Sequence, residues 1–185
     1  FGHIGLFAEQ ISNWQIIREL SKLGSSKEEQ FKVLNLFAYT GGSSLAAGQG
    51  GANVVHLDAS KTSVAWARAN AEINDLTSAP IRWITDDVQK FVAREVRREN
   101  KYHGIILDPP SFGRGVKGEV WKIEEHLLEL LDNLKKILDE NFAFVLLSSH
   151  SHGYTPEAMK NILGDLLSEY KGVYQIHEML IQEKD

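Results

Sequence analysis

A short apolar run that passes directly into two glycines, KVLNLFAYTGGSS at residues 32–44, constrains the fold more than any other stretch. The run has the length and character of a strand buried on both faces of a parallel sheet. Gly41 and Gly42 let the backbone turn sharply and come close to a ligand, because no Cβ stands in the way. We predict that Ser43 or Ser44 caps the following helix, at 45–48, whose free N–H groups face the same space. The stretch therefore predicts one half of a nucleotide-type site.

Strand and helix patterns alternate along the rest of the chain. Short apolar runs predict further strands at 52–57, 81–84, 104–107 and 142–147, with 173–181 as a candidate sixth strand. Apolar residues at helical spacing predict helices at 11–23, 60–74, 88–96, 121–138 and 155–170, while 1–10 has the pattern of an extended arm. In the helix at 60–74 we expect Val64, Ala67 and Ile73 to point inward. The alternation predicts an α/β fold, with a mostly parallel sheet and helices on both faces.

The composition excludes several classes of protein. The chain has 185 residues, 43% of them hydrophobic and 24% charged, which suits one domain with a real core. It has no cysteine, so disulfides, thiolate metal sites and cysteine nucleophiles are excluded. Neither a membrane helix nor a signal peptide is visible, so we expect a cytoplasmic protein without a membrane partner. The net charge of −5 argues mildly against a large nucleic-acid surface, and the start at Phe1 suggests a piece of a longer protein.

Asp58 follows the second predicted strand, where parallel α/β sheets bind ligands beyond the carboxyl ends of their strands. A carboxylate there can accept both ribose hydroxyls of a nucleoside, although Asp58 is also a good helix N-cap. The turn at 40–45 reads Thr-Gly-Gly-Ser-Ser-Leu and lacks the G-x-G-x-x-G pattern, which disfavours a dinucleotide with its pyrophosphate. It suits a nucleoside without phosphates, such as S-adenosylmethionine.

Two more acidic segments follow strands. Asp86 and Asp87 end the third strand, where one carboxylate can accept the exocyclic amine of adenine while the Val88 N–H bonds a ring nitrogen. The alternative is a pair of helix caps; we expect Asp86 to cap and Asp87 to bind. Asp108-Pro109-Pro110-Ser111-Phe112 follows the fourth strand, and its prolines fix acceptors that can hold a planar amine or base edge. An aromatic ring such as Phe112 can stack on that base.

Two other segments are glycine-rich or rich in histidine. The stretch 111–119 is glycine-rich and basic, so we predict a mobile loop that orders over the substrate, with Arg114 and Lys117 touching phosphate. His150 and His152 flank Ser151 without an obvious third ligand, and we interpret them as polar loop residues rather than a metal site.

Four motifs together resemble a known family. VLNLFAYTGGSSLAA, VVHLDAS, ITDDVQKF and LDPPSFGRG, in this order and spacing, resemble the class I S-adenosylmethionine-dependent methyltransferases, whose fold is Rossmann-like. More narrowly, they are similar to the bacterial large-subunit (23S) rRNA methyltransferase group, which carries N-L-F-x-Y-T-G and D-P-P-x-F. The resemblance covers roughly residues 1–151. It is highly specific for the cofactor and much less specific for the substrate.

The resemblance implies a role for each motif. For the cofactor, Tyr39, Thr40 and Gly41 would surround the methionine part, Asp58 would hold the ribose with Ala59 flanking adenine, and Asp87 and Val88 would read the adenine edge. Asp108, Pro109, Pro110 and Phe112 would form the acceptor site beside the methyl group, and Phe7 and Gln10 would cover the pocket. We therefore expect an arm and helix at 1–30 and a catalytic domain at 31–185, in one compact unit.

Two departures from the family bear on the reaction. Relatives that methylate carbon 5 of cytosine use a cysteine, often after the fifth strand, where this chain has Ser148-Ser149-His150. A serine hydroxyl is a weak nucleophile without an activating base, so we expect direct transfer to a base nitrogen, without a metal. The fold of the family normally ends with two strands that form a hairpin at the sheet edge. In this chain only one strand fits within 172–185, so we expect the last strand to be missing or truncated.

Three other functions remain open at this point. A nicotinamide-dependent oxidoreductase can use a similar sheet, although the turn at 40–45 and the Asp108 motif argue against it. A methyltransferase-like binding module would bind the cofactor without turnover. A methyltransferase could instead act on a protein or a small molecule.

Overall fold

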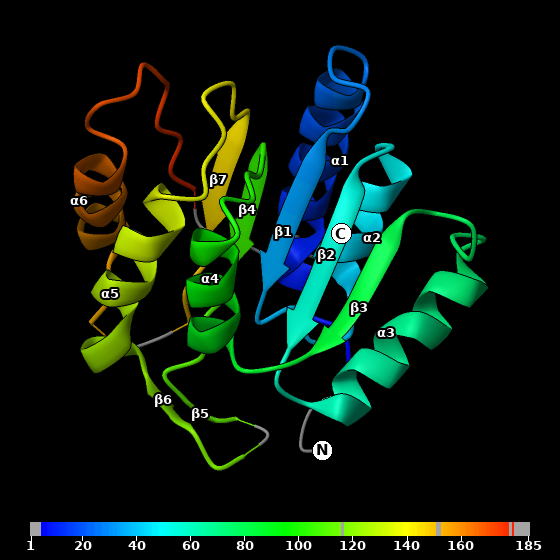
Figure 1. Cartoon of the computed structure of the whole chain (residues 1–185), viewed down its shortest axis with the longest axis horizontal. Helices are drawn as coiled ribbons and strands as arrows, with labels where there is room; N and C mark the ends of the chain where they lie inside the picture. Colours follow the sequence, from blue (N-terminus) through cyan, green and yellow to red (C-terminus); the bar gives the residue numbers. More distant parts are fainter. Residues whose placement is uncertain (1–4, 116, 151–152, 178, 180–185) are drawn as a thin grey trace, which may run out of the picture.

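The structure is a computed structural model that describes residues 5–115, 117–150, 153–177 and 179. Its centre is a five-stranded parallel sheet in the order β3-β2-β1-β4-β7, with helices on both faces (Figure 1). The sheet strands are β1 (Lys32–Leu36), β2 (Asn53–Asp58), β3 (Ile81–Thr85), β4 (Gly104–Leu107) and β7 (Phe144–Leu147). The helices are η1 (Ala8–Gln10), α1 (Ile11–Ser25), α2 (Gly42–Gln49), α3 (Lys61–Ile73), α4 (Val88–Arg97), α5 (Ile123–Lys135) and α6 (Pro156–Leu166). The predicted fold class is confirmed.

The strand order reverses at β1, which pairs with β2 on one side and with β4 on the other. Leu36 lies opposite Leu57 in β2 and opposite Leu107 in β4, so the three strands end at the same level. The segments after these strands therefore emerge side by side at the carboxyl edge. This is the place where open α/β sheets bind ligands.

Each face of the sheet has its own apolar core. On one face, Ile17 of α1 and Ala46 and Ala47 of α2 pack with strand side chains such as Val33 and Ile106. On the other face, α4, α5 and α6 cover the sheet, and the leucine stripe of α5 is buried as its spacing predicts. These apolar contacts hold the strand ends in place and leave the edge for polar groups.

A buried polar chain crosses the core below the glycine turn. The Asn35 amide donates to Ser44 Oγ at 2.8 Å, and Ser44 Oγ lies 2.9 Å from His56 Nδ1. The His56 ring packs on Trp83, with ring centroids 4.9 Å apart. Burial lowers the pKa of His56 to about 3, because the charged imidazolium loses its hydration there. Strands β1 and β2 and helix α2 are thus joined by polar as well as apolar contacts.

Several local predictions were wrong. Helix α2 begins at Gly42, and its N-cap is Gly41 in the left-handed region at φ 93°, so Ser43 and Ser44 lie inside the helix and do not cap it. Ser44 instead joins the buried polar chain. Residues 8–10 of the expected extended arm form the 3-10 helix η1. In α3, Ile73 is 79% exposed and Ala71 takes the inward position, because Val64, Ala67 and Ala71 share one face of the helix at i, i+3 and i+7, and position 73 lies off that face.

The predicted mobile loop at 111–119 is largely a hairpin. Strands β5 (Phe112–Arg114) and β6 (Val120–Lys122) pair antiparallel, and Trp121 of β6 is buried against Phe37 with ring centroids 4.8 Å apart. At the other end of the chain, residues 173–177 of the candidate sixth strand form no strand, and 178, 180 and 181 lie outside the described residues. No helix in the described part has the length and hydrophobicity needed to cross a bilayer.

Candidate functional site

Asp58 fastens two strand ends together at the carboxyl edge. Its Oδ2 accepts the backbone N–H of Tyr39 at 2.8 Å, and its Oδ1 accepts the N–H of Ser60 at 2.8 Å. Burial raises the pKa of the Asp58 carboxyl, and these two hydrogen bonds partly offset that rise. Ser60, rather than Asp58, caps α3, because its Oγ accepts the N–H of Ser63. The carboxylate therefore lies at the end of β2, where we predicted a ribose-binding group, and contacts the turn after β1.

Tyr39 has an unusual backbone conformation and an unpartnered hydroxyl among the described residues. Its backbone lies in the left-handed region at φ 47°, as does that of Phe37 at φ 56°, an unusual conformation for bulky residues. Its hydroxyl is buried without a hydrogen-bond partner among the described residues. The Phe7 ring of the N-terminal arm lies 5.8 Å from the Tyr39 ring. A strained turn with an orphaned buried hydroxyl fits a bound polar molecule.

The N-terminal arm is tied to the same turn. Thr40 donates its hydroxyl to the Gly5 carbonyl at 2.6 Å, and the Asn70 amide of α3 donates to the Thr40 carbonyl at 2.9 Å. The side chain of Thr40, predicted to contact the cofactor, is thus occupied by the arm. A Cβ on Gly42 would lie 2.6 Å from the Trp14 ring, so this glycine serves the close packing of α1 on α2.

Both aspartates after β3 hold helix α4. Asp87 is the N-cap, and its Oδ1 accepts the N–H of Lys90 at 3.0 Å. Asp86 accepts the N–H of Asp87 at 2.8 Å and forms an ion pair with Arg94. The buried Val88 begins the helix, where a backbone N–H has no partner within the helix. The structure gives Asp87 the capping role, and its role in reading adenine stays a prediction.

Asp108, at the end of β4, is contacted by side chains from two segments, η1 and the residues that follow β7. Ser148 Oγ donates to its Oδ1 at 2.6 Å, and Gln10 Nε2 donates to its Oδ2 at 3.3 Å. His150 Nε2 lies 3.6 Å from Oδ1. Gln10 and Ser148 are both buried, while Asp108 is partly exposed. The carboxylate is thereby fixed in direction and still open to a further donor.

The two prolines lead from Asp108 to the hairpin. Pro109 is buried, and the Pro110 carbonyl accepts the indole N–H of Trp121 at 2.8 Å. Phe112 begins β5 and is 54% exposed, with the Arg114 guanidinium 5.9 Å from its ring centroid. An exposed ring next to a cation can stack on a nucleobase.

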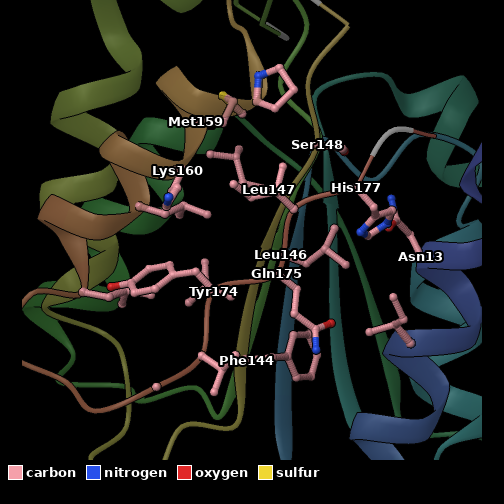
Figure 2. A pocket seen from close by; sticks show the side chains of 18 of the residues that line it. Asn13, Phe144, Leu146, Leu147, Ser148, Met159, Lys160, Tyr174, Gln175 and His177 are labelled. Atoms are coloured by element: carbon pink, nitrogen blue, oxygen red, sulfur yellow. The ribbon is translucent and has the colours of Figure 1, made fainter.

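A cavity of about 1320 Å³ lies along the outer edge of β7, between α1, α6 and the segment that follows α6 (Figure 2). Its lining includes Asn13, Ser148, His150 and His177. It begins beside the predicted site and runs away from it. Within the described residues no group of three or more histidine, aspartate or glutamate side chains has the arrangement of a metal site.

The sequence reasoning missed Asn13 and the contacts that Ser148 and His150 make. Ser148 was visible as the residue after the fifth strand, and the parallel pairing of β7 with β4 places it beside Asp108. His150 lies in a loop, as interpreted, and its ring is near the same carboxylate, a contact that was not predicted. Asn13 carries no sequence signal, because its partners come from residues 10, 177 and 179.

Acidic and glycine-rich segments at the carboxyl edge of a parallel sheet, beside the reversal of strand order, define a Rossmann-like nucleoside-binding domain. The sequence profile of one family, described as S-adenosylmethionine-dependent methyltransferase, matches residues 17–138. The chain belongs to this family, and its cofactor is S-adenosylmethionine. The residues of the site fit that cofactor, since Asp58 places carboxylate oxygens at the carboxyl edge and Tyr39 a buried hydroxyl without a hydrogen-bond partner among the described residues.

Two ribosomal RNA large subunit methyltransferases, named I and K/L, are similar to the chain. Ribosomal RNA large subunit methyltransferase I of Aeromonas salmonicida is 40% identical over 113 residues, which is 60% of this chain and 27% of the relative. The methyltransferase K/L of Shewanella frigidimarina is 36% identical over 126 residues, 67% of this chain and 17% of the relative. The chain thus spans about a quarter or less of these curated relatives.

Solved structures of methyltransferases have a fold similar to that of this chain. A SAM-dependent methyltransferase from Agrobacterium tumefaciens superposes with a TM-score of 0.85 at 40% identity, covering 90% of this chain and 52% of that one. SMU.776, solved as a complex with SAH, superposes with a TM-score of 0.73 at 30% identity, covering 90% of this chain and 42% of that one.

Proposed function

We propose that this chain is the catalytic domain of a methyltransferase that methylates a base nitrogen in large-subunit ribosomal RNA. The observation that carries the proposal is the pair of carboxylates, Asp58 and Asp108, on either side of the turn after β1. One suits the ribose of the cofactor and the other an amine of the acceptor. The names of the rRNA-modifying relatives support the choice of substrate.

Bound S-adenosylmethionine supplies an electrophilic methyl group on a positively charged sulfur. The role of the chain is to hold both reactants in line and to exclude water. Asp58 would bind the ribose hydroxyls. Asp108 would accept an N–H of the acceptor amine and so aim the nitrogen lone pair, while Phe112 stacks on the base.

The absence of a cysteine supports direct transfer to nitrogen. Ser148 stands after β7, and its hydroxyl is engaged as a donor to Asp108 at 2.6 Å. A hydroxyl in this role does not attack a base carbon. The nitrogen would form its bond to the methyl carbon as the carbon–sulfur bond breaks, the electron pair passing to sulfur, and the proton that the methylated amine releases would pass to the Asp108 carboxylate.

We also propose that residues 1–30 cover the cofactor pocket above a catalytic domain at 31–185. The contacts of Gly5 with Thr40 and of Phe7 with Tyr39 support this division. We further propose that Asp87, Val88 and Ala59 contact the adenine of the cofactor, and this proposal follows from the sequence motifs alone. An rRNA substrate would also agree with a cytoplasmic location.

Calorimetry with S-adenosylhomocysteine tests the pocket first. We expect binding by the intact chain and a loss of at least tenfold in Asp58→Ala, because the ribose loses its acceptor. Asp132→Ala, an exposed position on α5, is the matched control and should bind normally. Failure of the intact chain to bind would overturn the assignment of this site.

Transfer of a labelled methyl group tests the substrate. Unmodified large-subunit rRNA transcript should accept label, and nucleoside analysis should find it on nitrogen. Label on carbon 5 of a pyrimidine would contradict the nitrogen acceptor. If the cofactor binds and label appears on protein instead of RNA, a protein acceptor is favoured. If the cofactor binds and no label is transferred, a binding module without turnover is favoured.

A further inference from the structure

A chain of hydrogen bonds connects the segment after α6 to the Asp108 carboxylate. His177 Nε2 lies 2.9 Å from Asn13 Oδ1, Asn13 Nδ2 donates to Gln10 Oε1 at 2.6 Å, and Gln10 Nε2 donates to Asp108. Figure 2 shows His177 against Asn13 beside strand β7. This series of hydrogen bonds joins residues from opposite ends of the sequence to the proposed acceptor site.

The donor and the acceptor in each of these hydrogen bonds follow from the chemistry of the side chains. A carboxylate only accepts, so Gln10 must turn its NH₂ group toward Asp108. Its oxygen then needs a donor, which Asn13 supplies. Gln10 and Asn13 are 6% and 3% exposed, so the contact between them is largely shielded from bulk water. Asn13 therefore keeps the Gln10 amide in the one orientation that suits a carboxylate.

Ser148 completes the arrangement. Its hydroxyl donates to the other oxygen of Asp108 at 2.6 Å and lies 3.4 Å from Gln10 Nε2. Ser148 is also buried, at 7% exposure. Both carboxylate oxygens thus have a buried donor that comes from a different segment. Two such donors hold the carboxylate in one rotamer. Without them, the strand alone would leave the side chain free to rotate.

We propose that Gln10, oriented by Asn13, and Ser148 are positioning residues that fix the Asp108 carboxylate toward the acceptor amine. The proposal rests on the proposed function, because it assigns Asp108 to the acceptor site. It changes the role of Gln10, which we had predicted to cover the cofactor. The arm would then act on the reaction through Asp108, in addition to covering the pocket.

The test compares two ligands that differ at the reacting position. Sinefungin carries a protonated amine in place of the methyl-bearing sulfonium, whereas S-adenosylhomocysteine has no group there. The ratio of their dissociation constants reports how well Asp108 meets a cation at the methyl position, and it needs no RNA. We expect Asp108→Asn to lower the preference for sinefungin roughly tenfold, as for a lost charged hydrogen bond.

Each positioning variant is measured alone and combined with Asp108→Asn. Gln10→Ala and Ser148→Ala should each lower the preference severalfold. Asn13→Asp should do the same, because it can only accept and so turns the Gln10 oxygen toward Asp108. In the Asp108→Asn background all three effects should vanish, which a general loss of structure would not produce. Gln15→Ala and Asn161→Asp are exposed controls and should leave the ratio unchanged.

The outcomes separate this inference from the proposed function. If Asp108→Asn leaves the ratio unchanged, Asp108 does not face the methyl position and the acceptor site itself is wrong. If Asp108→Asn lowers the ratio while the positioning variants do not, or if their effects persist in its background, the positioning role is overturned. Thermal unfolding identifies any variant that does not fold, and Ser148→Ala, the smallest change, then decides.

Discussion

Asp58 keeps a carboxylate where burial opposes its charge. Its pKa is raised in the folded chain by desolvation, so the folded state favours the protonated form more than the unfolded state does. The contribution of Asp58 to stability must therefore fall as pH rises from the unfolded value of about 3.9 through the raised value. A group retained at this cost is a functional candidate.

Asp58→Asn tests this cost. We expect the unfolding free energy of wild type, relative to that of the variant, to fall as pH rises above the unfolded pKa of about 3.9, because only the wild type must ionise. The variant should also bind S-adenosylhomocysteine more weakly. Urea unfolding at several pH values measures the difference. A difference that grows with pH would mean that the fold stabilises the charged form.

The contribution of His56 to stability changes with pH in the opposite direction to that of Asp58. Its pKa in the folded chain is about 3, well below the unfolded value of about 6.5, so the unfolded state binds the extra proton between these values. Stability from this residue should be lost as pH falls through that window, by up to about 1.4 kcal/mol per pH unit. His56→Gln cannot take up that proton. We expect acid unfolding monitored by circular dichroism to be less steep in the variant, and an equal slope would contradict the buried neutral histidine.

The hairpin β5–β6 is held at two places. Trp121 anchors it to the sheet, and Glu119 Oε1 pairs with Lys90 Nζ of α4 at 2.6 Å. The hydrogen bond from Lys90 lowers the pKa of Glu119 to about 2, so the pair stays charged at physiological pH. The hairpin is therefore linked to the same helix that Asp86 and Asp87 hold.

Lys90→Met should free the hairpin without unfolding the domain. Exposed ion pairs contribute roughly 0–1 kcal/mol, so the melting temperature should change little. Amides of β5 and β6 should exchange faster with deuterium, while those of β1 and β4 should not. Lys160→Met removes an exposed pair with Glu157 on α6 and is the control. Unchanged exchange in the hairpin would show that Trp121 alone anchors it.

The hairpin and the start of α2 show why some elements escaped prediction. Strands β5 and β6 have three residues each, too few for a period to be read. They pair because Trp121 is buried against Phe37, a contact between distant parts of the chain. At α2, the left-handed conformation of Gly41 starts the helix earlier than a serine cap would.

The charge of the whole chain limits how it can bind RNA. The net charge is −5, so phosphate contacts must come from a local group of cations. Arg114 and Lys117 are both exposed and lie in or beside the hairpin that follows the Asp108 motif. This position would bring phosphate contacts next to the acceptor site.

Arg114→Ala with Lys117→Ala should weaken RNA binding and make it less sensitive to salt. Loss of two phosphate contacts should reduce the slope of log affinity against log salt concentration by roughly 1.4 to 1.8. Fluorescence anisotropy with a large-subunit rRNA fragment measures the slope, and Lys160→Ala with Lys171→Ala is an exposed control. An unchanged slope would place the phosphate contacts elsewhere.

The sequence by itself determined the five strands of the parallel sheet, most helices, the family and the cofactor. Strand periodicity, the paired glycines and the acidic residues after each strand are local signals, and parallel pairing turns them into one edge. Asp58 and Asp108 are predicted as site residues in this way.

Only the tertiary structure decided which groups surround those carboxylates. Gln10 is 98 residues from Asp108 and Ser148 is 40, so no local pattern can indicate that they meet. The same holds for Asn13 and His177, 164 residues apart. Hydrogen bonds between distant segments depend on how helices and strands pack, and the sequence signals here report only on each element's own period and ends.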